Sequence, residues 1–168
     1  MNIIDSSSLI LLAKIGALDK TLDHIKEKIT IPEKVYDESA KQKSTFDAKM
    51  IEERVKQKKI DQITIKNKKT YLKIKEDFSL GDGEAECITA CIETNSPLIT
   101  DDKRALNACK ILRIKYITVP NIIVQLHKRK IVQKKEAENY LRKLEKYGRY
   151  SKEIMNLVKE TLDNETNE

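Results

Sequence analysis

Histidine, cysteine and tryptophan are scarce in this sequence, and their scarcity excludes several kinds of site. The 168 residues contain two histidines, three cysteines and no tryptophan. Cys87 and Cys91 are spaced to share a helix face, but no histidine lies near them in the sequence. Buried thiols are therefore favoured over a zinc site or a disulfide framework. With so few histidines, no serine or cysteine has a credible partner for nucleophilic catalysis.

Long apolar segments and phosphate-binding glycine motifs are also absent. No stretch approaches the roughly 20 apolar residues that span a membrane, and Met1 leads into a strand-like run without a signal peptide. The sequence therefore predicts a cytoplasmic protein that does not associate with a membrane. The segment GDGEAE (81–86) begins like a dinucleotide-binding fingerprint, but its acids would repel a pyrophosphate.

Charged side chains make up 36% of the chain, with a net charge of +6 at pH 7. A basic excess favours an anionic partner, and nucleic acid is the first candidate. A composition rich in Lys, Glu and Ile is equally typical of hyperthermophile proteins, so the charge alone leaves both interpretations open. Basic stretches at 56–59, 66–69 and 128–130 are solvated faces unless a nuclease site lies beside them.

Strand-like and helix-like segments alternate along the chain. Short β-branched or alternating runs predict strands at 3–4, 29–31, 60–65, 97–100 and 116–119. Apolar periodicity predicts helices at 9–14, 18–25, 46–58, 67–75, 84–94, 103–112, 120–130, 134–147 and 151–163, and one after Pro32. Leu72 and Ile92 are expected to point inward. The alternation predicts an α/β fold with a mainly parallel sheet covered on both faces.

Acidic residues follow the predicted strands. Asp5 ends the first strand, and Asp101 and Asp102 follow the fourth. Glu84 begins the helix that leads to the fourth strand, and Glu38 lies on the helix after the second. If the first and fourth strands are neighbours at the switch point of an open α/β sheet, Asp5, Glu84 and Asp102 meet there. Glu38 would approach from its own helix.

Several carboxylates in one place need a counter-ion, because they cannot all stay ionised together. Mg2+ and Mn2+ prefer oxygen ligands, and a bound ion can activate water and neutralise charge on a phosphate. The residues alone therefore predict metal-dependent phosphodiester hydrolysis. The alternative is structural. Asp5 and Asp102 would each cap a helix, and the serines that follow Asp5 are also good caps. Glu84 would be a favourable acid in the first turn of its helix, and Glu38 would lie on a solvated helix face.

Four segments, in this order, resemble the PIN-domain family, and in particular the small prokaryotic proteins related to VapC toxins. They are IDSSSLI (4–10), IPEKVYDE (31–38), GEAE (83–86) and ITDD (99–102). The similarity covers about residues 1–130. The resemblance implies a three-layer α/β/α fold with a central parallel five-stranded sheet, and a ribonuclease site that depends on Mg2+ or Mn2+.

The resemblance also implies roles for single residues. The catalytic acids would be Asp5, Glu38, Glu84 and Asp102, and the metal ligands Asp5, Glu84, Asp102 and Asp101. Ser7 lies where these proteins often place a hydroxyl beside the first acid, and we expect Arg104, just after the acid pair, to lie near the substrate.

Three of these assignments have a competing neighbour. Glu84 and Glu86 lie about 200° apart on an ideal helix, so they cannot both point inward, and the spacing to Thr100 favours Glu84. Two further pairs stay open: Asp37 or Glu38, and Asp101 or Asp102. The third acid is Glu where many such toxins have Asp, and the longer side chain could weaken activity.

The expected organisation is a PIN-like nuclease domain over 1–130, with a C-terminal helical extension over 131–168 packed on the same domain. The resemblance implies an RNA substrate, an antitoxin protein that covers the acidic cleft, and a homodimer. The alternative function is a non-catalytic PIN-fold module that binds RNA or protein.

Overall fold

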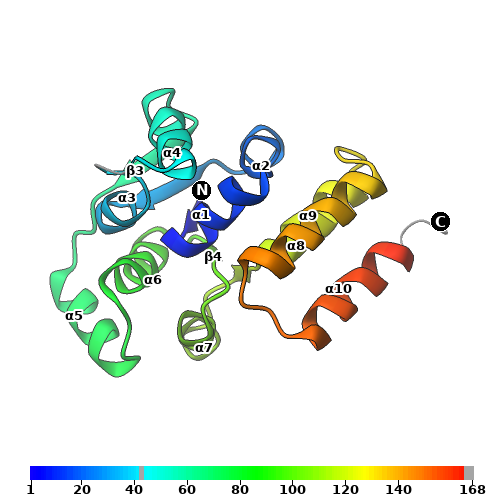
Figure 1. Ribbon diagram of the computed structural model, residues 1–168. Helices are drawn as coiled ribbons and strands as arrows, with labels where there is room; N and C mark the ends of the chain where they lie inside the picture. The colour runs from blue at the N-terminus through cyan, green and yellow to red at the C-terminus, as the bar shows by residue number, and fades with distance from the viewer. Residues whose placement is uncertain (42–43, 165–168) are drawn as a thin grey trace.

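The computed structural model describes residues 1–41 and 44–164, and Figure 1 shows an α/β fold around one parallel sheet. Its five strands lie in the order β3-β2-β1-β4-β5, and each neighbouring pair is parallel. They are β1 (Asn2–Ile4), β2 (Ile29–Pro32), β3 (Ile60–Ile63), β4 (Leu98–Ile99) and β5 (Tyr116–Ile117). The predicted fold class is confirmed, although β3, β4 and β5 are shorter than the sequence suggested.

Helices cover both faces of the sheet. They are α1 (Ser6–Ile15), α2 (Leu18–His24), α3 (Glu33–Ser39), α4 (Phe46–Lys56), α5 (Lys68–Asp77), α6 (Asp82–Thr94), α7 (Lys103–Leu112), α8 (Val119–Lys128), α9 (Lys134–Tyr147) and α10 (Lys152–Asn164). Helix α6 packs with α5 and α7, whereas α1 packs with α2, α4, α8 and α9. Figure 1 shows α5, α6 and α7 along the lower part of the view and α2 and α4 along the upper part. The result is three layers.

The switch point of the sheet lies between β1 and β4. Ile3 pairs with Leu98 and Ile4 with Ile99, and the Asp5 amide donates to the Ile99 carbonyl over 3.2 Å. Successive strands run outward from this point in both directions. The carboxyl ends of β1 and β4 therefore meet where an open α/β sheet forms a binding crevice.

The core is aliphatic, as the composition required. Ile3 and Ile4 are fully buried in the central strand, and all three cysteines are free and buried. Two expectations are wrong, because Leu72 is 61% exposed and Ile92 is 44% exposed. On α5 the buried position is Ile74, and the inner face of α6 carries Ile88 and Cys91, so each exposed residue lies beside the packed face rather than on it.

The C-terminal helices share this core. Helix α9 packs on α1 and α8, and α10 packs on α8 and α9. Leu141 and Leu144 of α9 and Met155 and Leu162 of α10 are buried in the same apolar cluster as the central strand. In the described part of the chain, no helix combines the length and apolar character that a membrane span requires.

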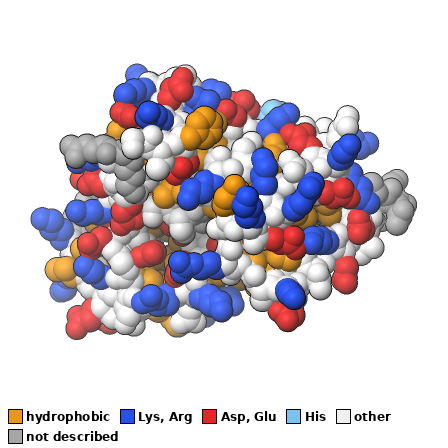
Figure 2. Space-filling model, in the orientation of Figure 1, with side chains coloured by type: hydrophobic (Ala, Val, Ile, Leu, Met, Phe, Trp, Pro, Cys, Tyr) orange, Lys and Arg blue, Asp and Glu red, His pale blue; other side chains and the backbone are white. Residues whose placement is uncertain are grey.

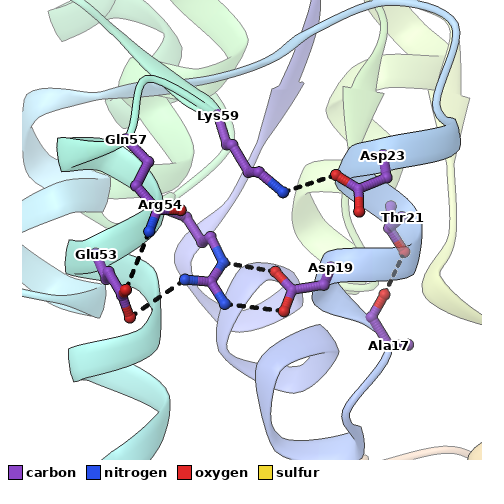
Figure 3. A network of polar contacts seen from close by, with 8 residues as sticks. All are labelled: Ala17, Asp19, Thr21, Asp23, Glu53, Arg54, Gln57 and Lys59. Carbon is purple, nitrogen blue, oxygen red and sulfur yellow. Dashed lines mark hydrogen bonds and ion pairs between the residues drawn. The ribbon is translucent and has the colours of Figure 1, made fainter.

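A charged network joins α2 to α4 (Figure 3). The Arg54 guanidinium donates to both oxygens of Asp19, at 2.6 Å from Nε and 2.9 Å from Nη2. Beside it the Lys59 ammonium contacts Asp23 at 2.8 Å. The Arg54 side chain is only 16% exposed and the Asp19 side chain 40%, so the cation is the shielded partner of this bidentate pair. The network fixes two helices of one layer to each other.

Candidate active site

Asp5 stands at the carboxyl end of β1 and is the N-cap of α1. Its Oδ1 accepts from the Ser8 amide at 2.7 Å and the Ser7 hydroxyl at 3.0 Å, and its Oδ2 accepts from the Thr100 hydroxyl. Asp5 therefore both caps a helix and lies at the end of a strand. The serines do not act as the cap, because the helix already begins at Ser6.

The Asp5 carboxyl is 2% exposed. Burial raises its pKa, and the hydrogen bonds from Thr100, Ser8 and Ser7 oppose that rise. Two donors occupy Oδ1 and one occupies Oδ2, so Oδ2 keeps one acceptor site. The fold thus holds a buried carboxylate in one orientation, with one acceptor position of Oδ2 not taken by these donors.

Thr100 joins the first acid to the last, and the sequence alone did not single it out. Its hydroxyl donates to Asp5 and accepts from the Asp102 amide at 3.1 Å. Asp102 caps α7, where its Oδ1 accepts from the amides of Arg104 at 2.8 Å and Ala105 at 2.9 Å. The sequence signal that could have identified Thr100 is its hydroxyl, placed directly between a predicted strand and two consecutive acids.

Glu38 and Glu84 approach the same place from α3 and α6. The Ser6 hydroxyl donates to Glu38 Oε2 at 2.7 Å. Gly83 makes room for this carboxylate, because a Cβ atom on Gly83 would collide with it. Burial raises the pKa of Glu84, and the charges of Asp102 and Glu38 raise it further. Asp102 and Glu38 therefore each lie within electrostatic reach of Glu84.

The competing acids have partners elsewhere. Glu86 accepts from the Lys34 amide at 2.9 Å, at the start of α3. Asp37 pairs with Lys41 at 2.9 Å on the surface. Asp101 accepts from the Val119 amide at 3.2 and 3.3 Å, at the start of α8. Burial raises the Asp101 pKa to about 6, although Tyr150 and Val119 lower it.

Ser7 and Arg104, the predicted substrate contacts, flank the acids. Ser7 lies beside Asp5 through its 3.0 Å hydrogen bond. Arg104 Nη1 donates to the Ser79 carbonyl at 2.7 Å, which ties the start of α7 to the loop before α6. Lys103 and Arg104 are both exposed. Figure 2 shows Lys and Arg side chains gathered over α7, near acidic side chains that surround a shallow hollow.

A comparison with domain families gives a match to the PIN domain over residues 1–164. The chain belongs to the PIN-domain family. No curated protein sequence matches the chain significantly. The PIN match runs past residue 130 and includes α9 and α10. PIN domains are in general nucleases, so the family and the strand-end acids agree on the general type of module.

PIN domains commonly use Mg2+ or Mn2+, and the acids of this chain fit such an ion in chemical type. Asp5 retains an acceptor site, and the repulsion of Glu84 by Asp102 and Glu38 is what a divalent cation relieves. Their spacing does not form a closed cage: within residues 1–41 and 44–164, no three Asp, Glu, His or Cys side chains lie close enough to hold one ion.

Proposed function

We propose that this PIN-domain protein is an endoribonuclease that hydrolyses RNA phosphodiester bonds with Mg2+ or Mn2+. One observation carries the proposal. Asp5 and Asp102 are joined through Thr100 at the switch point of the sheet, and the charges of Asp102 and Glu38 act on Glu84. Burial and the charges of neighbouring acids oppose the ionised form of Glu84, and groups perturbed in this way are candidates for function.

In this proposal, the chain's own residues bind and orient. A divalent ion at these oxygens supplies charge neutralisation on the phosphate and an acidified water. Asp5 offers a carboxylate that Ser7, Ser8 and Thr100 hold in one orientation. Glu84 has a raised pKa, which suits it to accept a proton from the attacking water. Asp101 stays a weaker candidate ligand than Asp102, because its carboxylate contacts the start of α8.

The deciding experiment is cleavage of a mixed-sequence single-stranded RNA. Wild type and Asp5→Asn are compared with Mn2+ and then with EDTA, after circular dichroism confirms folding. The matched control is Asp61→Asn, because Asp61 on β3 is an exposed acid that pairs with Lys28. We expect cleavage that requires metal, persists in the control and disappears in Asp5→Asn. Equal cleavage by wild type and Asp5→Asn would indicate a contaminating ribonuclease, and no cleavage by folded wild type would contradict the proposal.

We further propose that the protein is a cytoplasmic VapC-like toxin, neutralised by a small antitoxin whose segment covers the acidic cleft, and that it forms a homodimer. The family membership and the order of the acidic motifs support this finer assignment. A small neighbouring reading frame that encodes such an antitoxin would support the toxin role. A monomeric mass by light scattering at micromolar concentration would contradict the dimer.

A non-catalytic module that binds RNA or protein is the second candidate. It is favoured by the spacing of the acids, since no three in the described ranges can hold one ion as they stand. The longer Glu84 side chain, where many toxins of this kind have Asp, points the same way. Binding of Mn2+ separates the two candidates, because the nuclease requires it and the binding module does not.

A further inference from the structure

Each of the two glycines in the segment GDG (81–83) lies against a carboxylate of the proposed site. A Cβ atom on Gly83 would lie 2.9 Å from both Cδ and Oε1 of Glu38, and closer still to Oε2. A Cβ atom on Gly81 would lie 3.4 Å from Cδ of Glu84, and again closer to Oε2. At both positions an acid fills the space that a side chain would need. We call these two places the carboxylate seats, that of Gly83 for Glu38 and that of Gly81 for Glu84.

The backbone gives no other reason for glycine at these two positions. Gly81 is the N-cap of α6, with φ −69° and ψ 172°, an extended conformation that any residue adopts. Gly83 lies in the first turn of α6, and in the described part of the chain the only glycine with a positive φ is Gly16. A glycine within a helix costs stability relative to alanine. The close approach of the carboxylates is therefore what the missing Cβ atoms permit.

A second group holds Glu38 in its seat. The Ser6 hydroxyl, at the start of α1, donates to Glu38 Oε2 at 2.7 Å. The same oxygen is the atom nearest to the position that a Cβ atom on Gly83 would take. The carboxylate therefore contacts the amino ends of both α1 and α6. These two helix ends also carry the proposed ligands Asp5 and Glu84.

Asp82, between the two glycines, has its partners on another helix. Its Oδ1 accepts from the Tyr71 hydroxyl at 2.5 Å and from the Lys75 ammonium at 2.6 Å, both on α5. The acid of this segment thus contacts α5, whereas its glycines contact acids of the proposed site. The segment begins like a dinucleotide-binding fingerprint, but its glycine space is filled by the chain's own carboxylates.

We infer that Gly81 and Gly83 are positioning residues of the proposed active site, because each admits a carboxylate that a side chain would displace. The inference rests on the proposed nuclease function. The atoms that would clash are the ends of flexible glutamate side chains, so movement of the carboxylate accommodates an added methyl group more easily than movement of the backbone. Substitution by alanine should therefore leave the fold intact and move the acid.

The test combines Gly83→Ala with Glu38→Ala in a double-mutant cycle on the full chain. Glu38→Ala removes the carboxylate that the new methyl group would meet, so the cycle separates the seat from any general change in α6. Gly81→Ala and Ser6→Ala extend the test to the second seat and to the hydrogen bond. Asp82→Ala is the control, because Asp82 lies in the same helical turn and contacts α5.

Thermal unfolding in EDTA tests the seat without metal. Gly83→Ala should raise the unfolding temperature in the Glu38→Ala background, because alanine favours a helix. The gain should be smaller or reversed when Glu38 is present, since the displaced carboxylate loses its bond from Ser6. Equal shifts in the two backgrounds would overturn the inference, whatever the result for the nuclease.

Mn2+ binding, measured by electron paramagnetic resonance of the free ion, and RNA cleavage test the role in the site. Gly81→Ala and Gly83→Ala should each weaken Mn2+ binding and lower kcat by about tenfold, the lower end of the usual effect of residues that orient metal ligands. KM for RNA should stay unchanged, and Ser6→Ala should act in the same direction. Gly83→Ala should cause no further loss in the Glu38→Ala background, and Asp82→Ala should bind Mn2+ as wild type does.

Two outcomes separate the inference from the proposed function. Unchanged or tighter Mn2+ binding in either glycine variant, with wild type binding the ion, would overturn the inference. Absence of Mn2+ binding and of cleavage in wild type would contradict the proposed function, and the cycle in EDTA would still report whether Gly83 seats Glu38.

Discussion

Charged side chains are arranged in opposite ways in two regions of this protein. In the α2–α4 network, Asp19 meets Arg54, and the hydrogen bonds from that guanidinium lower the Asp19 pKa. Near the ends of β1 and β4, Glu84 meets the charges of Asp102 and Glu38, and burial raises the pKa of Asp5 and Glu84. The first arrangement stabilises the ionised form, whereas the second opposes it. Paired charges hold this fold together, and acids whose pKa is raised mark the place where it can act on something else.

The same substitution in the two regions should give the largest contrast. Asp5→Asn should lower RNA cleavage by at least about a hundredfold, because charge stabilisation of this kind is worth several kcal/mol. Its unfolding temperature should change little, since the amide oxygen can still accept from Ser8. Asp19→Asn should leave cleavage intact and lower the unfolding temperature. Cleavage assays and thermal melts of both variants check this. Loss of cleavage in both Asp5→Asn and Asp19→Asn would contradict the functional difference between the two regions.

Removing the cation from the network should cost stability alone. Arg54→Ala leaves Asp19 without its bidentate partner and loses the packing of a shielded side chain. We expect a loss of about 1–2 kcal/mol in the free energy of unfolding, measured in urea. Lys59→Ala is the control, because its exposed pair with Asp23 should contribute less than about 0.5 kcal/mol. Equal losses of unfolding free energy in Arg54→Ala and Lys59→Ala would show that the shielding of Arg54 adds no stability.

The two kinds of acid should give opposite pH dependence. Asp101 has a folded-state pKa of about 6, above the ordinary value near 4, so the folded chain binds more protons between those values. Its contribution to stability is full below about pH 4 and is lost as the pH rises through about 6, by about 1–2 kcal/mol. Asp19 has a lowered pKa, so its contribution is present at neutral pH and is lost in acid.

Urea unfolding from pH 3 to 7, in EDTA, measures both effects. Asp101→Asn should flatten the fall between about pH 4 and 6, and Asp19→Asn should reduce the loss below about pH 4. A steeper fall above pH 4 in Asp101→Asn would show that the sign assigned to Asp101 is wrong.

Arg104 should show the smallest effect, because its contact with RNA would be one among several. Arg104→Ala should weaken RNA binding a few-fold and reduce the slope of log affinity against log salt by about 0.7, the value for one phosphate of a single strand. Lys20→Ala, an exposed cation on α2, is the control. Fluorescence anisotropy over a range of salt concentrations gives both quantities, and an unchanged slope would exclude a phosphate contact.

The placement of Asp5 and Asp102 could be predicted because it depends on order along the chain. An acid that directly follows a buried parallel strand lies at the carboxyl edge of the sheet, whatever the details of packing. Helix geometry predicted in the same way that Glu84 and Glu86 do not both point inward, and Glu86 contacts the start of α3. Local periodicity also placed nearly every helix within a few residues of its observed bounds.

Contacts between distant segments could not be predicted. The bond from Thr100 to Asp5 and the bond from the Val119 amide to Asp101 depend on how strands and helices dock, which no local pattern encodes. Leu72 and Ile92 were assigned inward because an apolar residue on a helix suggests a buried face. The buried face is instead set by which neighbouring helix or strand is available to cover it.

The order of the strands also has a consequence for synthesis. Asp5 is made before Thr100 and Asp102, and these residues can join it only when β4 has docked beside β1. While a growing chain has β1 but not yet β4, it therefore carries Asp5 without Thr100 and Asp102. If the protein cleaves RNA, the message that encodes it lies beside an incomplete enzyme until β4 has been made.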